Sequence, residues 1–261
     1  MNYVALNKNK TIRLYYLKTF EIVEKGTSFL KLPNKILKIY RSFLAFSTLM
    51  YALDPQKKSL VTFYSGGQIS LMQSIANNYF LKGFIDLDLT KNIVYNNSIL
   101  KISKSMQLKT SYETIFKINN NPIATEVARY FKQSDGIRSF YLEWYEDKKS
   151  AVIFLQSMPN ATLKEFVAAK NLIKAHKNII NKPKLFMNNV LKETPLINEI
   201  PRIEYRCEYN KKYYLNKLLF LPDHDFYDLI ENHPKLTVDC EFCQKKYTFL
   251  ASTLIKLKRN L

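Results

Sequence analysis

The sequence predicts an α+β protein in three parts. The first part is a mixed β-sheet domain with packed helices, because strand-like and helix-like runs alternate through its residues. An apolar, partly helical linker follows, interrupted by prolines. The last part is a small domain whose Cys-x-x-Cys lies between two short β-type runs. We place the boundaries at residues 1–162, 163–203 and 204–261.

Composition indicates a folded protein of the cytoplasm. The 261 residues are 47% hydrophobic and 14% aromatic, which is ample for a core and atypical of disorder. No apolar run reaches the length that a bilayer span needs. The opening MNYVALNKNK lacks the apolar block of a secretory signal, and an odd number of cysteines argues against a secreted disulfide scaffold.

The chain is strongly basic. Lys plus Arg is 40 and Asp plus Glu is 22, so the formal net charge is +18. Such a surplus attracts polyanions such as RNA, membrane phosphates or acidic client proteins. The lysines are scattered, however, and the accompanying bias towards Asn, Ile and Tyr is typical of an AT-rich coding sequence. We therefore favour a compositional origin for the charge.

The first domain owes its sheet to runs of β-branched and aromatic residues bounded by turn residues. These runs cover 2–6, 11–17, three segments of a meander within 59–89, 99–118, 140–145 and 151–155. Gly66-Gly67 and Asn77-Asn78 mark the turns of the meander. No lysine or hydroxyl residue follows the glycine pair in P-loop spacing, so a phosphate cradle is not predicted there.

Two helices accompany these strands. Apolar residues recur every three or four positions from Ile36 to Met50, so a core helix is predicted between Pro33 and Pro55. Residues 123–134 predict a shorter helix with one apolar face. Strands and helices mixed in this way define an α+β domain.

The linker is predicted to begin with a helix at 163–180. Beyond it Pro183, Pro195 and Pro201 interrupt the chain, yet the residues between them stay apolar. An ordinary linker is polar, so this segment is expected to pack on another surface. Two interpretations stay open: permanent docking on the main domain, or a segment whose release exposes apolar surface.

The tail carries the pattern TVDCEFCQKKYTFL at residues 237–250. Its expected helices lie near 211–220, at 223–231 and from 252 onwards. The thiolates of Cys240 and Cys243 can share a tetrahedral zinc that takes two more ligands from elsewhere. The same thiols are close enough to form a disulfide, or they are simply half-buried in a hairpin. The tail is therefore predicted to be zinc-hairpin-like.

Several motifs occur in one order along nearly the whole chain. They are TIRLYYL at 11–17, the Gly66-Gly67 turn, YFKQSDGIRSF at 130–140, IFLQSMPNAT at 153–162, and Cys207 some thirty residues before the Cys-x-x-Cys. Together they resemble the 33 kDa chaperonin (heat shock protein 33) family. That family carries Cys-x-Cys and later Cys-x-x-Cys, a four-thiolate zinc pattern.

The resemblance implies one zinc per chain, held by Cys207, Cys240 and Cys243. Tyr209 occupies the position of the fourth thiolate, and a phenol with an ordinary pKa near 10 is a poor ligand at neutral pH. The candidates for a replacement ligand are Glu208, His224, His233 and Asp239. Cys240 and Cys243 can still form the redox disulfide, whereas Cys207 has no neighbouring thiol in the sequence.

The resemblance also implies an ATP-independent holdase that binds unfolding or oxidatively damaged client proteins, with a homodimer as one form of its activated state. In the family, oxidation of the thiolates releases zinc, the tail and linker unfold, and apolar surface is exposed. With Tyr209 in this chain we expect weakened redox regulation, with zinc held loosely or lost. Packing of tyrosines around Cys207 is an alternative means of folding the tail without metal.

Two other classes of function remain for comparison. The basic charge and a small zinc hairpin would suit a nucleic-acid- or ribosome-associated protein, the alternative to the holdase. An enzyme is not predicted. The sequence shows no Ser/His/Asp arrangement and no His-Glu-x-x-His, and the Cys-x-x-Cys lacks the strand-then-helix context of a thiol oxidoreductase.

Overall fold

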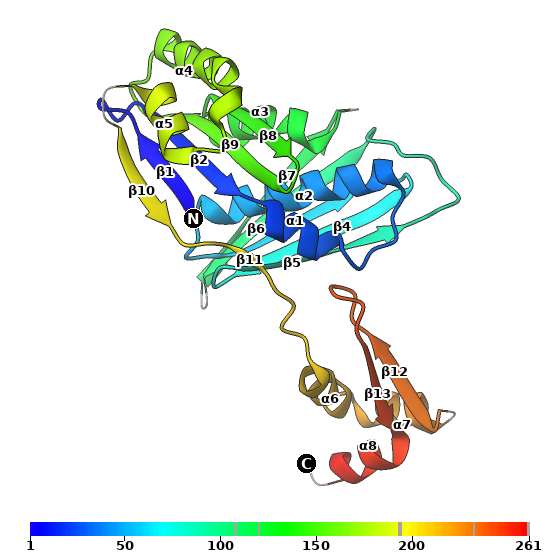
Figure 1. Cartoon of the computed structure of the whole chain (residues 1–261). Helices are drawn as coiled ribbons and strands as arrows, with labels where there is room; N and C mark the ends of the chain where they lie inside the picture. Colours follow the sequence, from blue (N-terminus) through cyan, green and yellow to red (C-terminus); the bar gives the residue numbers. More distant parts are fainter. Residues whose placement is uncertain (107–108, 120, 193–194, 232, 260–261) are drawn as a thin grey trace. The chain divides into compact units, whose positions relative to one another are not determined.

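The computed structural model describes residues 1–106, 109–119, 121–192, 195–231 and 233–259. The chain forms two compact units, Met1–Tyr205 and Arg206–Leu261, each with its own core (Figure 1). Among the described residues, no helix combines the length and the apolar character that a bilayer crossing requires. The predicted α+β class is confirmed.

One antiparallel sheet of the first unit has five strands in the order β10-β1-β2-β9-β8. Their bounds are Asn2–Leu6 for β1, Ile12–Lys18 for β2, Ser139–Glu146 for β8, Lys149–Ser157 for β9 and Leu196–Ile200 for β10. Side chains alternate along β2, so that Tyr15 and Leu17 enter one apolar core whereas Leu14 and Tyr16 enter another. Both faces of this sheet are therefore buried.

The second sheet of this unit has six strands in the order β11-β5-β4-β3-β6-β7. Their bounds are Lys58–Tyr64 for β3, Ile69–Asn77 for β4, Phe80–Leu87 for β5, Ser98–Met106 for β6, Lys109–Ile118 for β7 and Glu204–Tyr205 for β11. The predicted meander is β3 to β5. Its second turn lies one residue later than expected, because Asn78 and Tyr79 take the positive φ angles of 49° and 62°.

The predicted core helix is α2, Asn34–Ala52, and it packs in the core that both sheets share. Every residue from 43 to 52 is buried, as expected for a helix enclosed on all sides. The other helices of the first unit are α1 Phe20–Thr27, α3 Ile123–Ser134, α4 Leu163–Ala175, the 3₁₀ helix Lys177–Ile179 and α5 Pro183–Leu191. Helices α4 and α5 cover the second face of the five-stranded sheet.

Residues 163–203, described above as a linker, belong to the first compact unit in this structure. The apolar residues Phe186, Met187 and Val190 are buried on one side of α5. After α5 the chain returns as β10, which pairs with β1 at the sheet edge. In this structure the apolar residues of the segment are therefore packed on the first unit.

The second unit is an antiparallel hairpin surrounded by three helices, as expected for the tail. The bounds are Lys211–Leu219 for α6, Asp223–Glu231 for α7, Lys235–Asp239 for β12, Lys246–Leu250 for β13 and Ala251–Lys258 for α8. Its small core is formed mainly by Leu218, Leu219, Phe226, Ile230, Leu236, Phe249, Ala251 and Leu254. The hairpin turn projects beyond this core and carries two of the cysteines.

Candidate metal centre

The turn between β12 and β13 is closed by backbone hydrogen bonds. The Cys240 N–H donates to the Lys245 carbonyl oxygen at 2.9 Å, and the Gln244 N–H donates to the Cys240 carbonyl oxygen at 2.7 Å. Gln244 has a positive φ of 55°, which lets the chain reverse within a few residues. A turn this tight presents the thiols of Cys240 and Cys243 to one point.

Cys207 brings a third thiol to the same point from the segment that precedes α6. The Sγ atoms of Cys207, Cys240 and Cys243 all lie within 4.8 Å of one another, and those of Cys207 and Cys240 are 3.5 Å apart. All three are free cysteines. Cys207 has no neighbouring thiol in the sequence, but the fold closes a gap of 33 residues and brings it beside Cys240.

This spacing suits a metal ion. A disulfide would require about 2.05 Å between the sulfurs. Zinc with sulfur ligands at about 2.3 Å in a tetrahedron separates those sulfurs by about 3.8 Å, close to the observed distance of 3.5 Å. Cys240 is buried and the other two thiols are half-buried, so one side of the cluster is open. The three thiols fit zinc as a donor set.

The surroundings of the cluster favour one thiolate. Burial alone would raise the pKa of the Cys240 thiol, but hydrogen bonds from the Tyr214 hydroxyl and from the N–H groups of Cys243 and Phe242 outweigh it and lower that pKa. Burial raises the pKa of Cys207 to about 12, assisted by its hydrogen bonds to the two other thiols. Without metal, Cys240 is thus the acceptor and Cys207 a donor.

Tyr214 is the contact that the sequence did not predict. Helix α6 begins at an Asn210 cap, whose side chain accepts a hydrogen bond from the Tyr213 N–H at 2.9 Å. One turn along the helix, the Tyr214 hydroxyl reaches Cys240, and burial raises the pKa of this phenol well above its usual value. The only sequence signal was its membership of the tyrosine group around Cys207, which does not specify a partner.

Tyr209, at the position of the missing thiolate, packs with other rings. It stacks on Tyr213 at a centroid distance of 4.3 Å and meets the edge of Phe242 at 5.4 Å. The Tyr247 hydroxyl donates to the Tyr209 carbonyl oxygen at 2.8 Å. Burial raises the pKa of Tyr209, which disfavours the phenolate that a metal would need. We call Tyr209, Tyr213, Tyr214, Phe242 and Tyr247 the aromatic cluster.

The four candidate replacement ligands do not join the thiols in the part of the chain that the structure describes. The side chain of His224 is 91% exposed and lies 3.5 Å from Asp225. Asp239 pairs with Lys246, and both Glu208 and His233 are exposed. The cluster of potential metal ligands among the described residues therefore consists of the three thiols alone.

Comparisons with known proteins point to one family. The family model described as "Hsp33 protein" matches residues 2–250. The 33 kDa chaperonin of Alkaliphilus oremlandii is 23% identical, over 96% of this chain and 93% of its own length. That of Clostridioides difficile is 25% identical over 64% of this chain and 62% of its own. The crystal structure of a 33 kDa chaperonin from Thermotoga maritima has a TM-score of 0.79 at 18% identity and covers 99% of this chain and 97% of its own.

Proposed function

The chain belongs to the Hsp33 family, and on this premise we propose that it is a chaperone of the holdase type. It would bind unfolding proteins without ATP and keep them from aggregating, and it would act by binding alone. The name 33 kDa chaperonin, carried by its curated relatives, supports a chaperone. The observation that carries the proposal is the gathering of three free thiols in a small unit.

Zinc would be held by Cys207, Cys240 and Cys243, and when bound it would stabilise the fold of the second unit. An oxidant such as peroxide would take two electrons from two of these thiols, which lose two protons and form one disulfide while the peroxide becomes water. Cys240–Cys243 is the pair that we propose. Cys207, 3.5 Å from Cys240, can compete for that partner.

Because Tyr209 replaces a thiolate, such a switch would act differently from a four-thiolate site. One disulfide removes two of three ligands, so zinc would leave after a single oxidation event. The aromatic cluster would remain, however, since its packing of Tyr209 on Tyr213 and Phe242 does not depend on the thiols being reduced. We therefore propose that oxidation loosens the second unit without abolishing its structure.

The client surface that we propose lies on the first unit. The inner face of the six-stranded sheet packs on α2, whereas strand register places Tyr64, Ile115 and Lys101 on its outer face. Tyr64 is 44% exposed and Ile115 is 63% exposed. Half-buried apolar residues on the same face are Leu60, Leu71, Ile75, Phe84 and Ile99. Apolar side chains among lysines suit an unfolding chain that exposes apolar and acidic residues.

Light scattering of a chemically unfolded test protein, diluted into buffer with and without this chain, tests the proposal. We expect suppression of aggregation, with a larger effect after peroxide treatment. Ile115→Lys should weaken suppression because it adds charge to the proposed client surface. Leu163→Lys, on α4 and with a matched exposure of 62%, is the control that should not. Absence of suppression in both redox states would rule out a holdase.

A further inference from the structure

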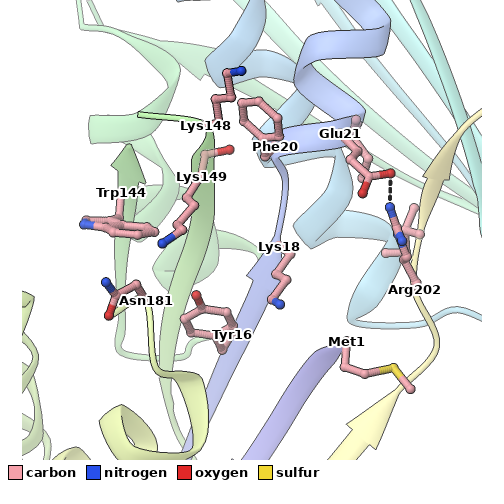
Figure 2. A pocket seen from close by; sticks show the side chains of 13 residues that line it. Met1, Tyr16, Lys18, Phe20, Glu21, Trp144, Lys148, Lys149, Asn181 and Arg202 are labelled. Atoms are coloured by element: carbon pink, nitrogen blue, oxygen red, sulfur yellow. Dashed lines mark ion pairs between the residues drawn. The ribbon is translucent and has the colours of Figure 1, made fainter. Parts of the chain in front are cut away.

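The first unit contains a cavity of about 290 Å³, and all of its lining residues belong to that unit (Figure 2). It lies where the last residues of β2 and β8 and the first residues of β9 meet the start of α1. Its volume is near the lower end of the roughly 300–1,000 Å³ that small-molecule sites occupy. The residues that determine its chemistry are Tyr16, Lys18, Phe20, Trp144, Lys148 and Lys149.

Strand register places an aromatic side chain and two lysines on the same face of the five-stranded sheet. Trp144 pairs with Ala151 on one side, and Lys18 pairs with Ala151 on the other, so all three lie in one row on one face of the sheet. Both of the larger neighbours of Ala151 line the cavity. Lys149, two residues before Ala151, projects from the same face.

The cavity is electropositive. Its charged lining residues are Lys18, Lys148, Lys149, Arg202 and Glu21. Arg202 and Glu21 form an ion pair with each other. The three lysines have no ion pair within the described part of the chain. Figure 2 shows the ammonium group of Lys149 beside Trp144, and that of Lys18 on the other side of the Tyr16 hydroxyl. Two cations that face one space would attract an anion.

Tyr16 adds a neutral donor to this space. The residue is only 2% exposed, yet its hydroxyl has no hydrogen-bond partner among the described residues and points into the cavity (Figure 2). Burial raises the pKa of Tyr16 to about 12, so the hydroxyl keeps its proton at neutral pH. A buried hydroxyl without a protein partner is a group that a ligand oxygen can satisfy.

We propose that this cavity binds a nucleoside phosphate. The base would lie against Trp144, while Lys18, Lys149 and the Tyr16 hydroxyl would contact the phosphate oxygens. A bare phosphate would leave the aromatic wall unused, and an uncharged ring would leave the lysines unpaired. The proposal concerns binding without hydrolysis. It is independent of the thiol centre and of the proposed client surface.

Trp144 is the only tryptophan of the chain, so its fluorescence reports this cavity alone. ADP, adenosine and pyrophosphate are titrated into the full-length reduced protein, with free tryptophan as the optical control and calorimetry as the second measurement. ADP is expected to quench the emission saturably. It should bind at least about tenfold more tightly than adenosine or pyrophosphate, because each of these lacks one half of the contacts.

The double variant Lys18→Ala with Lys149→Ala should weaken ADP binding by about tenfold or more while the thermal unfolding of the protein stays unchanged. Its control is Lys164→Ala with Lys174→Ala, which removes the same charge from exposed positions of α4 and should leave binding as it was. The proposal is overturned if ADP produces neither quenching nor heat. It is also overturned if pyrophosphate binds as tightly as ADP, or if both double variants weaken binding equally.

Discussion

The two units of the chain bury their side chains on very different scales. In the first unit two sheets and α2 enclose large residues such as Phe46, Phe154 and Tyr51, all at 0% exposure. The second unit fully buries Phe226 and Leu254 but has a far smaller core. At fewer than about 70–80 residues, an apolar core of this kind seldom supplies more than about 3–5 kcal/mol.

The comparison indicates that the units are stabilised by different means. The first can rely on apolar burial at roughly 25 cal/mol per Å². The core of the second unit does not hold all of its segments together, so the unit needs a further link. The thiols supply one, because they bring Cys207 beside a hairpin 33 residues away. The aromatic cluster lies around these thiols, so it can substitute in part for a metal. Stability that depends on thiols can be changed by oxidants, whereas apolar burial cannot.

Cys240→Ala should give the largest difference in effect between the two units. We expect this change to abolish zinc binding, since it removes the buried thiol of the three, and to lower strongly the protection of the second unit, which then depends on its small core and the aromatic cluster. Structural zinc contributes about 10–16 kcal/mol in small zinc domains, so this is the largest effect predicted. Hydrogen exchange measured for both units, together with zinc content, checks it. Wild-type protection in the second unit would show that metal does not stabilise it.

Phe154→Ala is the counterpart in the first unit. The ring is fully buried and lies 4.7 Å, centroid to centroid, from that of Phe131. We expect the first unit to lose about 3–5 kcal/mol of unfolding free energy in urea, while zinc per chain stays unchanged. A loss of zinc in this variant would mean that the two units do not fold independently, and the comparison would fail.

Tyr209→Cys should restore the fourth thiolate. We expect zinc affinity, measured by competition with a chromogenic chelator, to rise by more than about tenfold because the tetrahedron is completed by a charged ligand. The metal-free form should lose about 0.5–1.5 kcal/mol, since the stacking of Tyr209 on Tyr213 disappears. Unchanged zinc affinity would place residue 209 too far from the metal to act as a ligand.

Tyr214→Phe probes the hydrogen bond to Cys240 with the smallest change of shape. The variant keeps the ring but removes the hydroxyl that lowers the pKa of the thiol. The reduced, metal-free second unit should lose about 1.5 kcal/mol, the lower range for a hydrogen bond to a charged group. Denaturation monitored in the second unit measures it. Tyr227→Phe is the matched control, because Tyr227 is exposed on α7.

Much of the fold follows from patterns in the sequence. Long periodic segments such as α2, and turn residues such as those between β4 and β5, were predicted within a few residues. Helix α1 was missed because its eight residues are too few to show a clear period. Strand β10 was missed because pairing with β1 depends on a contact between residues nearly 200 positions apart. Its apolar residues indicated packing but could not specify a partner.

The candidate site was also predicted only in part from the sequence. The Cys-x-x-Cys spacing was enough to select Cys240 and Cys243 as candidates, whereas Cys207 was added by the resemblance to the heat shock protein 33 family. The hydrogen bond from Tyr214 could not be predicted, since it depends on the rotation of α6 relative to the hairpin turn. None of the four candidate replacement ligands lies with the thiols, because a carboxylate or imidazole near a cysteine in sequence can still point to solvent.

The central claim is that three thiols hold a metal that stabilises the second unit. Zinc per chain in the reduced protein, measured before and after hypochlorite or peroxide with free thiols counted in parallel, tests it most directly. We predict about one zinc and three free thiols before oxidation, then loss of the zinc with one disulfide formed. A reduced, folded protein that contains no zinc would contradict the claim and would leave the aromatic cluster as the stabilising element of the second unit.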